Sequence, residues 1–188
     1  MSKVLFVGAG NMGRAIIEGV LKKGSFTKSN VFFYEVNEDT ASNIEKEFGI
    51  ERILKMDERV KEASIIILAV KPQTFKNFIN DKEALNLRGF ITEKQTIVSI
   101  MAGISIQKIE EFFGEGIPVI RAMPNTAALV GLSATAMSFS KSVSQDNLER
   151  VKEAFLAVGI VEVVDEKLID AVTGLSGSGP AYVFMFIE

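Results

Sequence analysis

The sequence contains no cysteine, no histidine and no tryptophan, and only four prolines among its 188 residues. Without cysteine there is no thiol nucleophile and no disulfide, and without histidine there is no Ser-His triad. Both absences exclude nearly every zinc site, because zinc ligands in proteins are mostly cysteine and histidine. We therefore predict no metal site, and we expect any chemistry to take its reactive atom from a cofactor or a substrate.

Charge and hydropathy narrow the function classes further. Lys and Arg number 21 against 24 Asp and Glu, so no dense basic face is available for phosphates of a nucleic acid. The first apolar run, residues 4–7, is too short for a signal-peptide core or a membrane span. We expect a cytoplasmic, water-soluble protein without a nucleic-acid or membrane partner.

Short apolar runs alternate with amphipathic stretches of helical length along most of the chain. An uninterrupted run such as 64–70 is typical of a strand in a parallel sheet that helices cover on both faces. Residues 133–138 alternate instead, as an edge strand does. The expected strands are 4–7, 31–34, 64–70, 96–100, 119–123, 133–138 and 160–164, and the expected helices are 11–23, 38–48, 74–87, 105–113 and 145–158. This order predicts an α/β fold with a Rossmann-type, doubly wound, mostly parallel sheet.

The last segment has a different pattern. Residues 176–180 are typical of a helix start, with Ser178 or Gly179 as the N-cap and Pro180 in the first turn. Residues 181–187 are all apolar, and a helix that is apolar all round must be buried all round. We expect either that the natural chain continues or that a partner covers this helix.

A G-x-G-x-x-G motif, residues 8–13, follows the first predicted strand and opens the first predicted helix. In a dinucleotide-binding turn Gly8 permits the tight turn, Gly10 lets the backbone approach a pyrophosphate, and Gly13 allows close helix packing. The amides at the helix N-terminus then face the negative charge. This context favours a dinucleotide site over a turn without a ligand.

The second part of this fingerprint is an acidic residue at the end of the second strand, and Glu35 occupies that position. A carboxylate there accepts hydrogen bonds from ribose hydroxyls and repels a 2′-phosphate, which favours NAD(H). A solvated charge at a strand end is the alternative. Asn37 offers a hydrogen bond to a ribose or phosphate oxygen, so the motif alone leaves the cofactor open.

Three further strand exits, residues 69–73, 99–103 and 121–126, meet at the same predicted sheet edge. Lys71 is a candidate general acid, but its ordinary pKa near 10.4 favours a solvated cation. Small residues in 99–103 leave room for a planar ring, although a plain turn has the same composition. Asn125 and Thr126 fit contacts to cofactor or substrate and serve equally well as turn formers.

The segments VGAGNMG, LAVKPQ, SIMAGI, RAMPNTAALVG and AVTGLSGSGPAYVF, in this order and over the whole chain, resemble those of the pyrroline-5-carboxylate reductase family. The resemblance implies reduction of the C=N bond of pyrroline-5-carboxylate to L-proline with NADPH or NADH, the last step of proline biosynthesis. Because the nicotinamide supplies the hydride, this chemistry suits a chain without histidine and cysteine. No residue is assigned a catalytic role.

The resemblance also implies site residues. Cofactor contacts carried over by position are Val7, Gly8, Ala9, Gly10, Asn11, Met12, Glu35, Asn37, Met56, Ala69, Val70, Lys71, Pro72, Ile100, Met101 and Ala102, and the candidate substrate contacts are Asn125, Thr126 and Ser176. Many relatives have Arg at the position of Val36, and its absence beside Glu35 favours NADH. Relatives usually have Asn at the position of Met56, which reduces that contact to packing.

Family members continue through a helical domain that binds substrate and forms a dimer. We therefore expect residues 1–164 to be a dinucleotide-binding domain, residues 165–188 to begin the helical domain whose remainder is absent, and the full-length form to be a homodimer or larger. A chain that ended at Glu188 is expected to bind cofactor with little turnover. A non-catalytic NAD(P)-binding module and another Rossmann reductase are the alternatives, the latter disfavoured because no histidine is available as acid or base.

Overall fold

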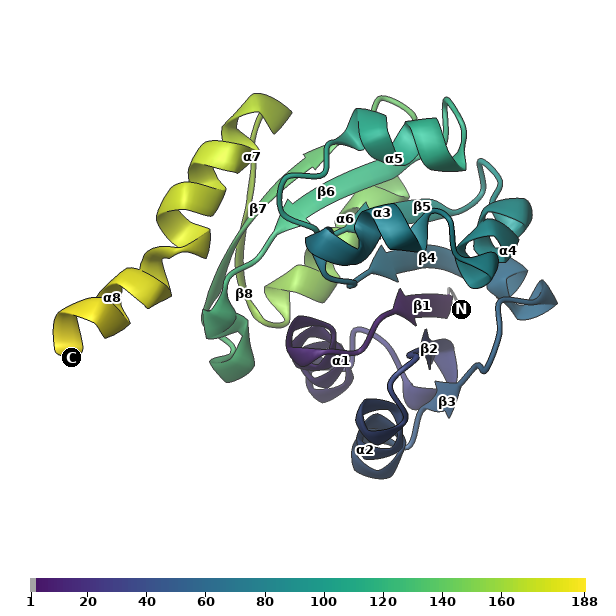
Figure 1. The fold of residues 1–188 in the computed structure, drawn as a ribbon, viewed down its shortest axis with the longest axis horizontal. Coiled ribbons are helices and arrows are strands. Elements are labelled where there is room, and N and C mark those ends of the chain that lie inside the picture. Colours follow the sequence, from purple (N-terminus) through teal and green to yellow (C-terminus); the bar gives the residue numbers. More distant parts are fainter. Residues whose placement is uncertain (1–2) are drawn as a thin grey trace.

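The computed structural model describes residues 3–188 and is built on one eight-stranded sheet (Figure 1). The strand order is β3-β2-β1-β4-β5-β6-β7-β8, and the strand pairs are parallel except for β6 with β7. The strands are β1 Lys3–Val7, β2 Val31–Tyr34, β3 Glu51–Arg52, β4 Ala63–Leu68, β5 Thr96–Ser99, β6 Val119–Met123, β7 Ser133–Phe139 and β8 Gly159–Val163. The predicted Rossmann-type, mostly parallel sheet is confirmed.

Helices cover both faces of this sheet (Figure 1). On one face α1, α2 and α6 pack in one apolar cluster, and on the other face α4 and α5 contribute to a second. The helices are α1 Asn11–Lys23, α2 Glu38–Phe48, α3 Phe75–Phe78, α4 Lys82–Phe90, α5 Ile106–Phe113, α6 Gln145–Leu156, α7 Glu166–Val172 and α8 Gly179–Ile187. Because both faces are covered, β5 is buried throughout and β4 is buried except at Ser64, which explains their apolar runs.

Local signals place the first two helices where the sequence predicts them. Helix α1 ends at Gly24, whose φ of 75° is left-handed, and α2 ends at Gly49 in the same conformation. Asn37 caps α2 by accepting a hydrogen bond from the Thr40 amide at 2.8 Å. These boundaries depend on neighbouring residues alone.

The predicted helix 74–87 is wrong, because the chain forms two short helices with a turn between them. Asp81 starts α4 by accepting a hydrogen bond from the Glu83 amide at 2.8 Å. An aspartate in the middle of an amphipathic stretch thus acts as an N-cap and interrupts the helix.

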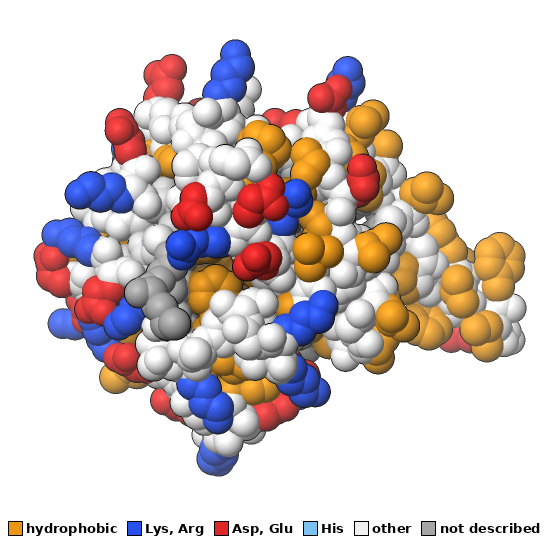
Figure 2. Space-filling model, turned by 180° about the vertical axis from the view of Figure 1, so that it is seen from behind, with side chains coloured by type: hydrophobic (Ala, Val, Ile, Leu, Met, Phe, Trp, Pro, Cys, Tyr) orange, Lys and Arg blue, Asp and Glu red, His pale blue; other side chains and the backbone are white. Residues whose placement is uncertain are grey.

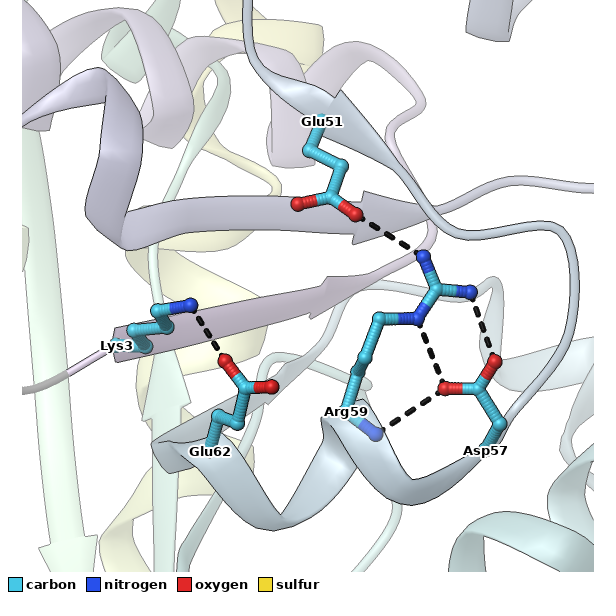
Figure 3. Close-up of polar contacts among 5 residues, drawn as sticks. All are labelled: Lys3, Glu51, Asp57, Arg59 and Glu62. Atoms are coloured by element: carbon cyan, nitrogen blue, oxygen red, sulfur yellow. Dashed lines mark hydrogen bonds and ion pairs between the residues drawn. The ribbon is translucent and has the colours of Figure 1, made fainter.

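The segment between α2 and β4 also contains structure that the pattern does not predict, namely β3 and a 3-10 helix, residues 58–62. Arg59 joins the two by pairing with Asp57 at 2.8 Å and with Glu51 at 3.0 Å (Figure 3). The hydrogen bond from Arg59 lowers the pKa of Asp57 from 3.8 to about 2.

Strand β7 lies inside the sheet, so its assignment as an edge strand is wrong. It pairs antiparallel with β6 and parallel with β8, and β8 forms the edge. Gly159 makes this pairing possible, because a Cβ there would lie 1.9 Å from the carbonyl oxygen of Ser133. The alternation of β7 reflects small and polar residues that are buried, including Ser133 and Thr135.

The C-terminal segment is one helical run: α7, a π-helical turn Thr173–Gly177, and α8. Helix α8 begins at Gly179, with Ser178 at the N-cap position and Pro180 in the first turn, as the sequence predicts. The Ser178 hydroxyl makes no capping hydrogen bond and donates instead to the Thr173 carbonyl at 3.1 Å. Helix α8 points away from the sheet and has no buried residue (Figures 1 and 2). Within residues 3–188, no helix is both long and apolar enough to cross a bilayer.

Candidate dinucleotide-binding site

The glycine turn after β1 touches the exit of β4. Gly8 has a φ of +93°, and its amide donates to the Tyr34 carbonyl at 2.8 Å. A Cβ on Gly8 would lie 2.8 Å from the Ala69 carbonyl oxygen, and one on Gly13 would lie 2.7 Å from the Gly8 carbonyl oxygen. Side chains at these two positions would push β1, β4 and α1 apart, so both glycines are needed by the fold.

Gly10 differs from its two neighbours in the motif. Its φ of −63° is open to any residue, and no protein atom beyond its chain neighbours lies within 4 Å of the place a Cβ would take. No side chain caps the first turn of α1, and a pocket of about 530 Å³ lies beside Ala9, Gly10 and Asn11. An uncapped helix start with open space beside it fits an anion such as a pyrophosphate.

Glu35 reaches across to this turn from the end of β2. Its Oε2 accepts a hydrogen bond from the Ala9 amide at 2.8 Å, and its Oε1 accepts one from the Asn37 amide at 2.9 Å. The carboxylate therefore stands between the glycine turn and the start of α2. The side chain of Val36 next to it is 73% exposed and offers no cation.

Arg52, which the pattern reasoning missed, supports this corner from β3. Its guanidinium donates to the backbone carbonyl of Glu35 at 2.8 Å and to the Glu38 carboxylate at 2.7 and 2.8 Å. These hydrogen bonds lower the pKa of Glu38. A two-residue strand carries no periodic signal, so only the fold brings Arg52 to this place.

The exits of β4 and β5 lie side by side at the same edge. The Ile100 amide donates to the Leu68 carbonyl at 3.2 Å, and the Met101 amide donates to the Ser99 hydroxyl at 3.3 Å. Met101 is buried, while Lys71 is exposed at the start of a 3-10 turn. The structure thus brings residues 7–12, 69–72 and 100–102 to one sheet edge.

Met56 lies apart from the surface of the site. Its side chain is 3% exposed within the second apolar cluster, and its amide donates to the Glu83 carboxylate at 2.5 Å. Nearby Tyr34 has a raised pKa, first because it is partly buried and then because of carboxylates around it. Met56 belongs to the apolar core, and its contact to a cofactor stays a prediction.

Two of the three candidate substrate residues meet at the exit of β6. The side-chain Nδ2 of Asn125 donates to both the carbonyl and the hydroxyl oxygen of Ser176, each at 3.3 Å. Thr126 is exposed at the start of a 3-10 helix and takes no part in this contact. In the described residues no cluster of three or more acidic, His or Cys side chains is arranged for a metal.

This fold and this glycine turn define a class, the Rossmann-type dinucleotide-binding domains of nicotinamide-dependent oxidoreductases. A family model described as NADP oxidoreductase, coenzyme F420-dependent, matches residues 3–103, and one described as pyrroline-5-carboxylate reductase dimerisation matches residues 166–188.

Curated relatives make the family specific. The chain is 39% identical to pyrroline-5-carboxylate reductase of Methanosarcina acetivorans over 99% of its own length and 67% of the relative. It is 36% identical to the enzyme of Arabidopsis thaliana over 99% of its own length and 65% of the relative. The chain belongs to the pyrroline-5-carboxylate reductase family and spans about two thirds of the length of these relatives.

Solved structures agree with this assignment. Pyrroline carboxylate reductase of Plasmodium falciparum, solved with NADP bound, has a TM-score of 0.84 and 30% identity over 99% of this chain and 66% of that one. The pyrroline-5-carboxylate reductase of Coxiella burnetii has a TM-score of 0.88 and 28% identity over 98% of this chain and 67% of that one. The NADP in the Plasmodium falciparum structure and the NADP oxidoreductase family model both indicate a nicotinamide dinucleotide as the cofactor.

Proposed function

We propose that the protein reduces the C=N bond of 1-pyrroline-5-carboxylate to give L-proline, with a reduced nicotinamide dinucleotide as the hydride donor. The observation that carries the proposal is the convergence of an open glycine turn with the exits of β4 and β5 in a chain of this family. When bound, the nicotinamide supplies the hydride to the imine carbon. The imine nitrogen takes a proton, for which this chain offers no assigned donor.

In this proposal the chain's own groups bind the dinucleotide and orient it. The uncapped amides at the start of α1 bind the pyrophosphate, and the Glu35 carboxylate accepts from ribose hydroxyls. Residues 100–102 line the end of the site where the ring lies. These cofactor contacts are predictions, supported by the shared sheet edge and by the free space at Gly10.

An activity assay tests the proposal. The full-length form of the protein is incubated with pyrroline-5-carboxylate and either NADH or NADPH, and the loss of the reduced-nicotinamide absorbance is followed together with L-proline formation. We expect turnover with at least one dinucleotide. Dinucleotide binding without turnover supports a non-catalytic NAD(P)-binding module instead, and turnover only with hydroxy or keto acids supports a different Rossmann reductase.

We propose NADH as the preferred cofactor. Glu35 places a negative charge at the end of β2, and Val36 leaves the neighbouring position without a cation for a 2′-phosphate. The variant Glu35→Ser with Val36→Arg is expected to strengthen NADPH binding relative to NADH, measured by titration of both dinucleotides. Val130→Arg, which adds the same cation to another exposed valine, is the control. An unchanged ratio in the double variant contradicts the assignment of this strand end.

We further propose that residues 1–164 form the dinucleotide-binding domain, that residues 165–188 begin a helical domain, and that copies of the chain associate through it. The match of residues 166–188 to the dimerisation model supports this. So do the apolar side chains that are exposed in and near this segment, which are Ile160, Leu168, Leu175, Tyr182, Val183, Phe184, Met185, Phe186 and Ile187. Sedimentation of the protein and of Phe186→Asp tests this association, and a monomer at micromolar concentration contradicts it.

We also propose a cytoplasmic location, which cell fractionation tests.

A further inference from the structure

Arg121 is a buried cation in a strand that is otherwise apolar. It lies on β6 with its side chain 5% exposed, in register with Ser99 of β5. Burying a guanidinium costs several kcal/mol, and an apolar residue at such a position commonly gives equal or greater stability. Arg121 is therefore poorly explained by stability alone, and its partners indicate what else it does.

Both partners come from α7. The guanidinium lies 3.3 Å from Oε1 of Glu166 and 2.6 Å from Oδ1 of Asp170. These carboxylates are four residues apart, so they lie on the same face of the helix. Ile169 beside them is fully buried. The ion pairs and this apolar contact dock α7 onto the sheet.

Glu166 extends the cluster to a third element. The oxygen that faces Arg121 also accepts a hydrogen bond from the Ile106 amide, at 2.7 Å, at the first residue of α5. One carboxylate thus joins β6, α7 and the helix that follows β5. The Nε of Arg121 is buried without a hydrogen-bond partner among the described residues, so within that part of the chain the guanidinium is held by its two terminal nitrogens.

A second attachment between the two segments lies four residues after Arg121 and six residues after Asp170. Asn125, just beyond β6, binds Ser176 in the π-helical turn, and a Cβ on Gly177 would lie 3.0 Å from the end of the Met123 side chain. Helix α8 beyond this turn has no buried residue. The direction of the helical run is therefore set at two points, Arg121 and Asn125. Single π-helical turns are frequent at functional sites.

We propose that Arg121 is a positioning residue: its pairing with Glu166 and Asp170 holds the π-helical turn, and Ser176 within it, against the edge where the strand exits converge. This inference rests on the proposed reductase function for its effect on turnover. It deepens that function, because it names the residue that orients the substrate end of the site. The dinucleotide end, at β1 and β2, lies outside the contacts of Arg121.

The test uses Arg121→Met, which fills the buried space without charge, and the double variant Glu166→Gln with Asp170→Asn, which keeps the size of both side chains. We expect kcat/KM for pyrroline-5-carboxylate to fall on the order of tenfold, since small displacements in a reacting geometry are costly. The Kd for NADH is expected to stay within about twofold of the unaltered protein, and amide exchange in the π-helical turn to be about tenfold faster. Asp165→Asn is the control, because among the described residues that carboxylate forms an ion pair only with exposed Lys167.

The outcomes separate the inference from the proposed function. Unchanged exchange of the π-helical turn in both variants overturns the positioning role, whatever the activity. If the unaltered full-length form does not turn over, the proposed function fails, while faster exchange in the variants and not in Asp165→Asn still supports the attachment. A parallel loss of NADH binding and of melting temperature in both variants shows a general structural role and also overturns the inference.

Discussion

Substituting Gly10 by alanine separates the ligand role of the glycine motif from its role in the fold. At Gly8 and Gly13 a Cβ would collide with backbone oxygens at 2.8 and 2.7 Å, whereas at Gly10 it would meet no protein atom within 4 Å. The backbone of Gly10, with a φ of −63°, suits alanine. The first thing a methyl group there contacts is therefore a bound dinucleotide.

The magnitudes follow from this geometry. Replacing glycine by alanine at a compatible position stabilises by about 0.4–1 kcal/mol through the unfolded chain, and alanine is a poorer N-cap than glycine by a similar amount. We expect the free energy of unfolding of Gly10→Ala to stay within about 0.5 kcal/mol of the unaltered protein. Losing one charge-assisted hydrogen bond to the pyrophosphate costs about 1.5–3 kcal/mol, which weakens NADH binding roughly 10- to 150-fold.

The assay pairs thermal unfolding with a fluorescence titration of NADH. Gly89→Ala is the matched control, because Gly89 also has open space around it and lies in α4, outside the glycine turn. It is expected to bind NADH normally. Gly13→Ala is expected to lose stability as well as binding. NADH binding that is unchanged in Gly10→Ala refutes the close approach of a ligand to this backbone. A large fall in the melting temperature of Gly10→Ala refutes the claim that a methyl group fits at this position without contacting the protein.

Three further changes test the packing and electrostatics. Gly159→Ala places a Cβ 1.9 Å from a backbone oxygen of β7, so we expect at least about 2 kcal/mol of destabilisation in urea unfolding and faster amide exchange in β8; normal exchange there contradicts this. Phe155→Ala empties a fully buried site and is expected to cost about 3–5 kcal/mol, and a cost below about 1 kcal/mol contradicts the packing described for α6. The pKa of Asp57, 3.8 in its ordinary state, is about 2 in the fold because Arg59 donates to it. A lowered pKa adds stability that is fully present above about pH 4 and is lost as the pH falls through 2. The advantage over Asp57→Asn, about 1 kcal/mol after solvent screening, should therefore shrink as the pH falls from 4 to 2; an advantage that is undiminished at pH 2 contradicts it.

Much of the fold follows from local signals. The uninterrupted apolar runs of β1 and β4 require a sheet covered on both faces, and the glycines after α1 and α2 end those helices by adopting a left-handed backbone. The glycine motif and Glu35 meet in space because parallel strands bring their carboxyl ends to one edge. These features need only the order of residues and the geometry of a strand or a helix turn.

The errors arise where a long-range contact or a local cap overrides the periodic pattern. Residues 133–138 alternate like an edge strand, yet β8 pairs with them because Gly159 permits a close approach of the two backbones. The stretch 74–87 is amphipathic enough for one helix, but Asp81 caps a second one instead. Strand β3 is too short for any period, so Arg52 is invisible in the sequence although it braces Glu35.

The sequence by itself determined the class of fold, the glycine turn and the acidic strand end, because each depends on residues close together in the chain. The sequence places Arg121 at the third strand exit but does not name its partners, which lie 45 and 49 residues away. Only the tertiary structure decided that α7 docks on β6, that Asn125 meets Ser176, and that the apolar last helix stands clear of the sheet. Such contacts join distant segments, and no local pattern encodes which of the possible partners comes within hydrogen-bonding distance.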